Sequence, residues 1–171
     1  ELVNVVTTNG NQKMIIGTHA GYSVTFDENT VRDMGRTASG VRGIRLREND
    51  YVVGAAILDE NKEVLVITEN GYGKRTPVSE YRLSNRGGKG IKTANITEKN
   101  GPLAGLLTVK GDEDLMIITD TGVMIRTGVA NISQTGRSTQ GVKVMRLDQD
   151  AKIMTFTTVQ ADEKDEEVVE E

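Results

Sequence analysis

Residues 15–26 read IIGTHAGYSVTF, and related stretches recur as LVITENGYGKRTP at residues 65–77 and as MIITDTGVMIRTG at residues 116–128. The similarity extends over three segments that align without gaps: Met14–Leu46, Val64–Ile96 and Leu115–Leu147. Three sets of residues keep the same spacings of 50 and 51 positions: Gly21, Gly71 and Gly122; Gly40, Gly90 and Gly141; Arg36, Arg86 and Arg137. A shared offset at three independent positions is hard to obtain by chance, so we interpret the chain as a set of internal repeats.

Each repeat has the pattern of β-strands. Short runs of β-branched and aliphatic residues lead to a turn that ends in glycine, and another strand follows the glycine. At Asn70-Gly71 we expect a tight type I′ turn, which needs positive φ. Further strands are predicted in each repeat, at Val41–Leu46 and Val52–Leu58, at Ile91–Ile96 and Leu103–Val109, and at Val142–Leu147 and Ile153–Val159.

Four strands in about 50 residues is the period of a propeller-like blade. The predicted fold class is therefore all-β, with about three four-stranded blades in repeats near 14–58, 64–109 and 115–159, which form one domain over residues 1–159. The segment Leu2–Thr7 matches the last strand of a repeat. We therefore expect the natural protein to continue N-terminally with earlier blades.

Composition excludes several classes of protein. The 171 residues include no cysteine and one histidine, so disulfide scaffolds and multi-histidine metal sites are excluded. No apolar run approaches the length of a membrane helix. The net charge of -4 is unevenly distributed, because residues 160–171 hold seven acids and only one lysine, Lys164. We expect this segment to be a disordered acidic tail. It either competes with a polyanion for the basic body or only aids solubility.

The basic residues cluster in one loop of each repeat. The aligned loops span residues 35–42, 85–92 and 136–143 and share the order Arg, three residues, Gly, Val or Ile, then Arg or Lys. No acid occurs in the surrounding stretches Met34–Arg47, Tyr81–Thr97 and Thr121–Leu147. Because repeated units place equivalent loops at equivalent positions, we expect a basic band along one edge, which is typical of a surface that binds a polyanion.

The candidate phosphate-binding residues are Arg36, Arg42, Arg45, Lys74, Arg75, Arg86, Lys89, Lys92, Arg126, Arg137 and Lys143. Of these, Lys74, Arg75 and Arg126 lie on the adjacent predicted strand, where they either extend the band or form a solvated strand face. Small residues and glycines between the cations leave backbone N–H groups open to a ligand. No group of side chains has the spacing of a catalytic or metal site, so we assign no catalytic residue and no metal ligand.

The segments GRTASGVRGIRL at 35–46 and GRSTQGVKVMRL at 136–147, and above all Arg86-Gly87-Gly88-Lys89-Gly90, resemble the family of C-terminal domains of DNA gyrase A, which is part of a type IIA topoisomerase. The resemblance implies a six-bladed β-pinwheel whose blades exchange strands, of which this chain holds about the last three. The family's box reads Q-R-R-G-G-K-G, and here Ser84 and Asn85 replace its first two residues. The box-like loop is therefore degenerate.

The resemblance also implies a function. The family's domain binds duplex DNA without sequence specificity and bends it around its edge, which supports ATP-dependent negative supercoiling by the whole enzyme. It places the catalytic tyrosine, ATP and Mg²⁺ in other domains or in the ATPase partner subunit, so this chain needs no cofactor of its own. The implied location is the bacterial cytoplasm, in association with the nucleoid, with no membrane contact.

Two alternatives remain open. The chain could be the equivalent domain of the related topoisomerase IV subunit, although the Arg-Gly-Gly-Lys-Gly stretch and the clear third repeat favour gyrase. It could also be a protein-interaction module, because propeller-like edges commonly bind proteins and a basic band can hold an acidic partner.

Overall fold

The computed structural model describes residues 1–160, so the predicted acidic tail lies almost wholly outside the described residues. The prediction of an all-β fold is confirmed, because the regular elements are strands and three short 3₁₀ turns. The strands are β1 Lys13–Thr18, β2 Tyr22–Asp27, β3 Val52–Leu58, β4 Glu63–Thr68, β5 Tyr72–Pro77, β6 Ile91–Lys92, β7 Leu103–Val109, β8 Glu113–Thr119, β9 Met124–Gly128, β10 Val142–Lys143 and β11 Ile153–Gln160. The 3₁₀ turns are η1 Glu28–Thr30, η2 Val78–Glu80 and η3 Val129–Asn131.

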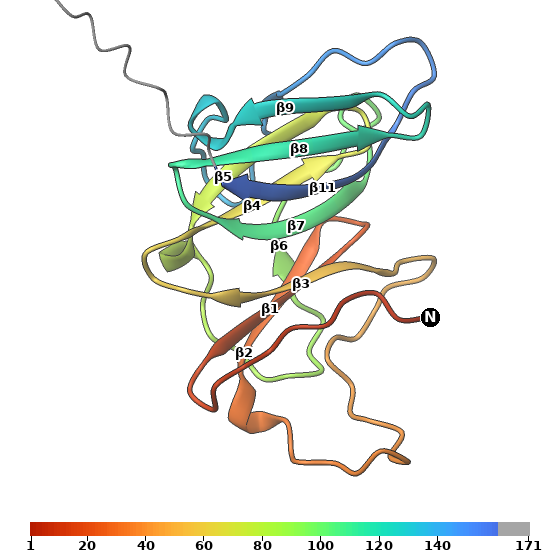
Figure 1. Cartoon of the computed structure of the whole chain (residues 1–171). Helices are drawn as coiled ribbons and strands as arrows, with labels where there is room; N and C mark the ends of the chain where they lie inside the picture. Colours follow the sequence, from red (N-terminus) through yellow and green to blue (C-terminus); the bar gives the residue numbers. More distant parts are fainter. Residues whose placement is uncertain (161–171) are drawn as a thin grey trace, which may run out of the picture.

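The strands form three sheets, with the orders β3-β1-β2-β6, β7-β4-β5-β10 and β11-β8-β9. Figure 1 shows the second sheet, which contains β4 and β5, between the first and third sheets. The fourth strand of the first sheet, β6, comes from the second repeat, and the fourth strand of the second sheet, β10, comes from the third repeat. The exchange of strands implied by the resemblance is therefore observed. The third sheet has three strands within residues 1–160.

Aliphatic side chains between neighbouring sheets form the core. One cluster lies between the first and second sheets and includes Ile15, Val66 and Leu106. A second cluster joins the second and third sheets through residues such as Leu65 and Ile117. Glycines allow β3 and β7 to approach closely, since a Cβ at Gly54 would lie 2.9 Å from the carbonyl oxygen of Leu106. The chain has only six phenylalanines and tyrosines and no tryptophan, so burial of Val, Ile and Leu supplies most of the hydrophobic stabilisation.

The hairpin turns differ from the prediction. In each turn the amide of the glycine donates to the carbonyl of the threonine three residues before it, at 3.0, 3.0 and 3.1 Å. Each threonine hydroxyl also accepts a hydrogen bond from the amide that follows the glycine. Gly71 has φ of 84°, but neither Glu69 nor Asn70 has positive φ. The type I′ prediction is therefore wrong, because a type I′ turn needs positive φ at both middle residues.

Four predicted strands are absent or shorter than expected. Residues 2–7 form no strand, and Leu2 and Val5 are 79% and 74% exposed. Residues 41–46 also form none. Only Ile91–Lys92 and Val142–Lys143 pair in the other two segments. These ladders end early because two consecutive amides, of Thr93 and Ala94, turn to the single carbonyl of Gly21; the amides of residues 144 and 145 do the same at Gly71.

Candidate nucleic-acid interface

Three basic loops contact one another in series. We call them L1 (residues 34–47), L2 (residues 84–97) and L3 (residues 135–147). The amide of Arg45 in L1 donates to the carbonyl of Gly88 in L2 at 2.8 Å. At the equivalent positions, the amide of Asn95 in L2 donates to the carbonyl of Thr139 in L3 at 3.0 Å. The structure thus brings the three loops together in the order of the sequence.

Most of the exposed cations without a partner within residues 1–160 lie on these loops, and Arg32, Arg82 and Lys110 lie outside them. Five of the predicted cations are exposed, and within residues 1–160 their charged groups make no hydrogen bond or ion pair: Arg36, Arg42, Arg45, Lys89 and Lys92. Lys143 is also exposed, with its ammonium 5.5 Å from the centre of the Tyr72 ring. The sequence prediction missed Arg146, which is exposed and equivalent to Arg45; the alignment of the repeats already contained that signal.

The arginine that recurs in the loops has a structural role in two repeats. Nη1 of Arg86 donates to the carbonyl of Arg42 at 2.7 Å, and its Nε donates to the carbonyl of Thr30 at 3.2 Å. Nη1 of Arg137 donates to the carbonyl of Lys92, which is equivalent to Arg42. Both arginines are half-buried. Each therefore holds its loop to the preceding loop, and phosphate contact by Arg86 and Arg137 stays a prediction.

Arg86→Ala is expected to lower the free energy of unfolding by about 1–2 kcal/mol, because it removes two charge-assisted hydrogen bonds at a half-buried site. Arg36→Ala is the matched control. Arg36 is exposed and its guanidinium has no partner within residues 1–160, so the expected change is within about 0.5 kcal/mol. Urea denaturation of both variants measures the difference. Equal stabilities would contradict the role assigned to Arg86.

In the second and third repeats, the glycine four residues after the recurring arginine packs against a strand of the preceding repeat and leaves no room for a side chain. Gly90 and Gly141 have φ of 73° and 79°. A Cβ at Gly90 would lie 2.5 Å from the carbonyl oxygen of Ser23, and one at Gly141 would lie 2.6 Å from that of Gly73. From the sequence these glycines are expected to allow close approach of a ligand. In the structure the close approach is to a strand of the preceding repeat.

The three strand cations predicted as possible extensions of the band have other partners. Lys74 is 1% exposed, and its ammonium donates to three oxygens of L3, so the prediction that it binds phosphate is wrong. Arg75 donates to Glu63 at 2.6 Å and to the carbonyl of Ile132 at 2.7 Å. Arg126 donates to Asp114 at 2.7 Å. A neighbouring carboxylate offsets the charge of both arginines, and phosphate contact by Arg75 and Arg126 stays a prediction.

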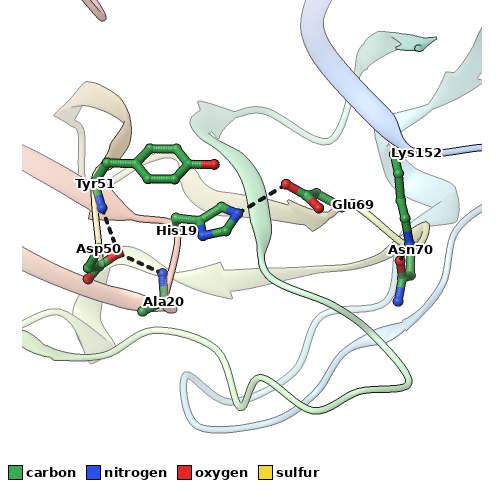
Figure 2. A network of polar contacts seen from close by, with 7 residues as sticks. All are labelled: His19, Ala20, Asp50, Tyr51, Glu69, Asn70 and Lys152. Carbon is green, nitrogen blue, oxygen red and sulfur yellow. Dashed lines mark hydrogen bonds and ion pairs between the residues drawn. The ribbon is translucent and has the colours of Figure 1, made fainter. Parts of the chain in front are cut away.

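A second set of polar contacts joins the repeats at their hairpin turns. Nε2 of His19 lies 3.0 Å from Oε1 of Glu69, and the His19 ring stacks on Tyr51 with centroids 4.3 Å apart. Figure 2 shows this group together with Asp50, whose Oδ1 accepts hydrogen bonds from the amides of Ala20 and Tyr51. Burial raises the pKa of Tyr51, and the charges of Glu69 and Asp50 raise it further.

A contact between the second and third repeats uses different residues. Nζ of Lys152 donates to Oδ1 of Asn70 (Figure 2). Neither contact has a signal in the sequence, because neither His19 nor Lys152 recurs at the matching position of another repeat.

Two other kinds of site are absent from residues 1–160. No three His, Asp or Glu side chains in this range are grouped so that they could hold a metal ion. No helix in the same range is long and apolar enough to span a membrane.

Comparison with known proteins gives consistent results. The family model described as "DNA gyrase C-terminal domain, beta-propeller" matches residues 12–59, 62–110 and 113–160. The DNA gyrase A protein of Staphylococcus aureus (strain NCTC 8325 / PS 47) is 55% identical over 168 residues, which are 97% of this chain and 19% of that protein. The chain therefore spans about a fifth of the length of such relatives.

Solved structures show the same architecture. A DNA gyrase A C-terminal domain superposes with a TM-score of 0.81 at 27% identity, over 86% of this chain and 50% of that one. The C-terminal domain of DNA topoisomerase IV superposes with a TM-score of 0.87 at 24% identity, over 92% of this chain and 50% of that one. The second likeness shows a shared fold only.

Proposed function

Because the chain belongs to the DNA gyrase C-terminal domain family, we propose that it binds duplex DNA without sequence preference and bends it along loops L1, L2 and L3. One observation carries this proposal. Most of the exposed cations without a partner within residues 1–160 lie on three loops that contact one another in series and contain no acid. Such a surface can neutralise successive phosphates of one duplex, which is the main source of non-specific DNA affinity.

The chemistry of the loops favours backbone binding over base reading. Arginine and lysine contacts to phosphate position a protein on DNA, whereas sequence is read by groups that enter a groove. Within residues 1–160 the helical elements are three-residue 3₁₀ turns, which are too short to act as a recognition helix. Bending a duplex by 40–90° costs about 1–6 kcal/mol, and neutralising phosphates on one side of the duplex can offset that cost.

The wider role proposed for the chain follows from the relatives. We infer that it supplies DNA wrapping to a type II topoisomerase that introduces negative supercoils. Other parts of that enzyme, including its ATPase partner subunit, hold the catalytic tyrosine, ATP and Mg²⁺. The 55% identity to a DNA gyrase A protein supports gyrase over topoisomerase IV.

Salt titration of duplex binding tests the proposal. Each phosphate contact makes the slope of log affinity against log salt more negative by about 0.9, so seven contacts give a slope of about -6. The seven side chains are Arg36, Arg42, Arg45, Lys89, Lys92, Lys143 and Arg146. Donor and acceptor dyes at the two ends of a duplex should also report a shorter end-to-end distance on binding. A flat salt response would contradict phosphate binding, and an unchanged dye distance would contradict bending.

A further inference from the structure

Lys74 occupies a position that the neighbouring sheets fill with aliphatic residues. It lies on β5 opposite Val66, and the equivalent pairs are Ile16 with Val24 and Ile117 with Ile125. Val24 and Lys74 are each 1% exposed. Burying an ammonium group costs free energy that an aliphatic side chain does not, so a buried lysine needs compensating partners.

The hydrogen-bond acceptors around the Lys74 ammonium belong to loop L3. Its Nζ donates to the carbonyls of Gly136 at 2.7 Å and Arg137 at 2.5 Å, and to the hydroxyl of Thr139 at 3.2 Å. An ammonium has three hydrogens, so these contacts use all of them. The same segment is tied to L2, because the carbonyl of Thr139 accepts the amide of Asn95.

Loops L2 and L3 are shaped by different means. L2 has glycines at positions 87 and 88, and Gly87 adopts φ of 80°. L3 has Ser138 and Thr139 at the equivalent positions. L2 lies over the sheet that carries Val24, whereas L3 is bonded to Lys74. The buried lysine, Lys74, thus contacts L3, the loop that has Ser138 and Thr139 in place of the two glycines.

We propose that Lys74 is a positioning residue, which touches no DNA and holds L3 in the conformation that presents its cations to the duplex. The DNA part of this inference rests on the proposed function. The positioning part concerns the free chain, so it can be tested without DNA.

The ionisation of Lys74 gives the inference a pH signature. Burial lowers its pKa to about 8; the carboxylate of Glu80 acts in the opposite direction, and the guanidinium of Arg137 acts with burial. Above that pH the neutral amine has two hydrogens for three acceptors. Nearby phosphate favours the protonated form, so DNA affinity should fall as the pH rises from 7 to 9. Every other titratable group is retained in Lys74→Met, so the difference between the two pH profiles reports Lys74.

The experiment compares Lys74→Met with Lys110→Met in the 171-residue chain. Both variants lose one lysine, but Lys110 is exposed, follows β7 and is not part of L3. In Lys74→Met we expect duplex affinity at pH 7 to fall about tenfold, the size of one charge-assisted hydrogen bond. Hydrogen exchange at the amides of Arg137 and Thr139 should accelerate by a similar factor. Lys110→Met should leave the exchange rates unchanged and should lower the affinity only slightly, through the loss of one positive charge from the overall field.

A second variant keeps the test decisive if Lys74→Met fails to fold. Lys74→Arg retains a cation with several donors that stays protonated over this range, so it should recover part of the exchange protection. Its DNA affinity should lack the fall between pH 7 and 9 that Lys74 contributes in the wild type. Normal exchange and normal DNA affinity in Lys74→Met would overturn the inference, as would an identical pH dependence of DNA affinity in wild type and Lys74→Arg. If wild type binds no duplex while exchange still accelerates in Lys74→Met, the positioning role stands and the proposed function fails.

Discussion

Simultaneous substitution of Arg42, Lys89 and Lys92 by alanine is expected to weaken duplex binding about 500-fold at ~0.1 M salt. The three side chains are exposed, and their charged groups have no partner within residues 1–160, so their removal should leave the fold unchanged. Each lost phosphate contact removes about 0.9 from the log–log salt slope, which should therefore flatten by about 2.7. Fluorescence anisotropy over a range of salt concentrations measures both quantities.

The control for this triple variant removes three lysines from elsewhere. Lys13, Lys62 and Lys110 lie outside the three loops, and their substitution by alanine changes the net charge by the same amount. We expect the control to lose a small part of the affinity through the weaker overall field. If both triple variants lost the same affinity, binding would depend on net charge, and the loops would not form the binding surface.

Gly90→Ala is expected to cost at least ~3 kcal/mol of unfolding free energy. Its Cβ would lie 2.5 Å from the carbonyl oxygen of Ser23, which is backbone and cannot move aside. Ser23 pairs with Ile91, so relief of the clash requires β6 to leave the first sheet. Urea denaturation should show the loss of stability. Because L2 is anchored by this pairing, duplex affinity should fall as well.

Gly40→Ala separates the cost of positive φ from the cost of the clash with the Ser23 carbonyl oxygen. Gly40 has φ of 80°, but a Cβ there would meet no atom within 4 Å. The variant therefore carries only the cost of positive φ, about 1–2 kcal/mol. If Gly40→Ala and Gly90→Ala destabilised the chain equally, the close contact with Ser23 would be irrelevant and the role given to Gly90 would be wrong.

The repeats made much of the fold predictable. An offset shared by glycines and arginines located three units, and runs of aliphatic residues located β3 and β7 at their observed bounds. The outer strands β6 and β10 were predicted too long, because the length of a paired strand depends on how far its partner strand continues beside it. β6 meets β2 for two residues before the turn at Gly21 ends the pairing. Local sequence does not carry that information.

The candidate site was predictable in outline only. Absence of acids identified the three loops, which the structure places in contact, but Arg42 and Arg86 look alike in sequence and differ in the structure. The guanidinium of Arg42 is exposed, whereas that of Arg86 donates hydrogen bonds to the backbone of the preceding repeat. Lys74 and Arg75 are adjacent, and a strand directs their side chains to opposite faces. Tertiary partners decide which cation is available, and a pattern of residue types does not record them.

The exchange of strands affects how the chain can fold as it is made. The first sheet lacks its outer strand until residues 91–92 have left the ribosome, about thirty residues after β3 is complete. The second sheet waits in the same way for residues 142–143. The first and second units therefore emerge with an open edge, and the completion of each depends on synthesis of the next unit. A stop codon placed after the first or the second repeat would remove every unit that follows it and leave the preceding unit without its outer strand.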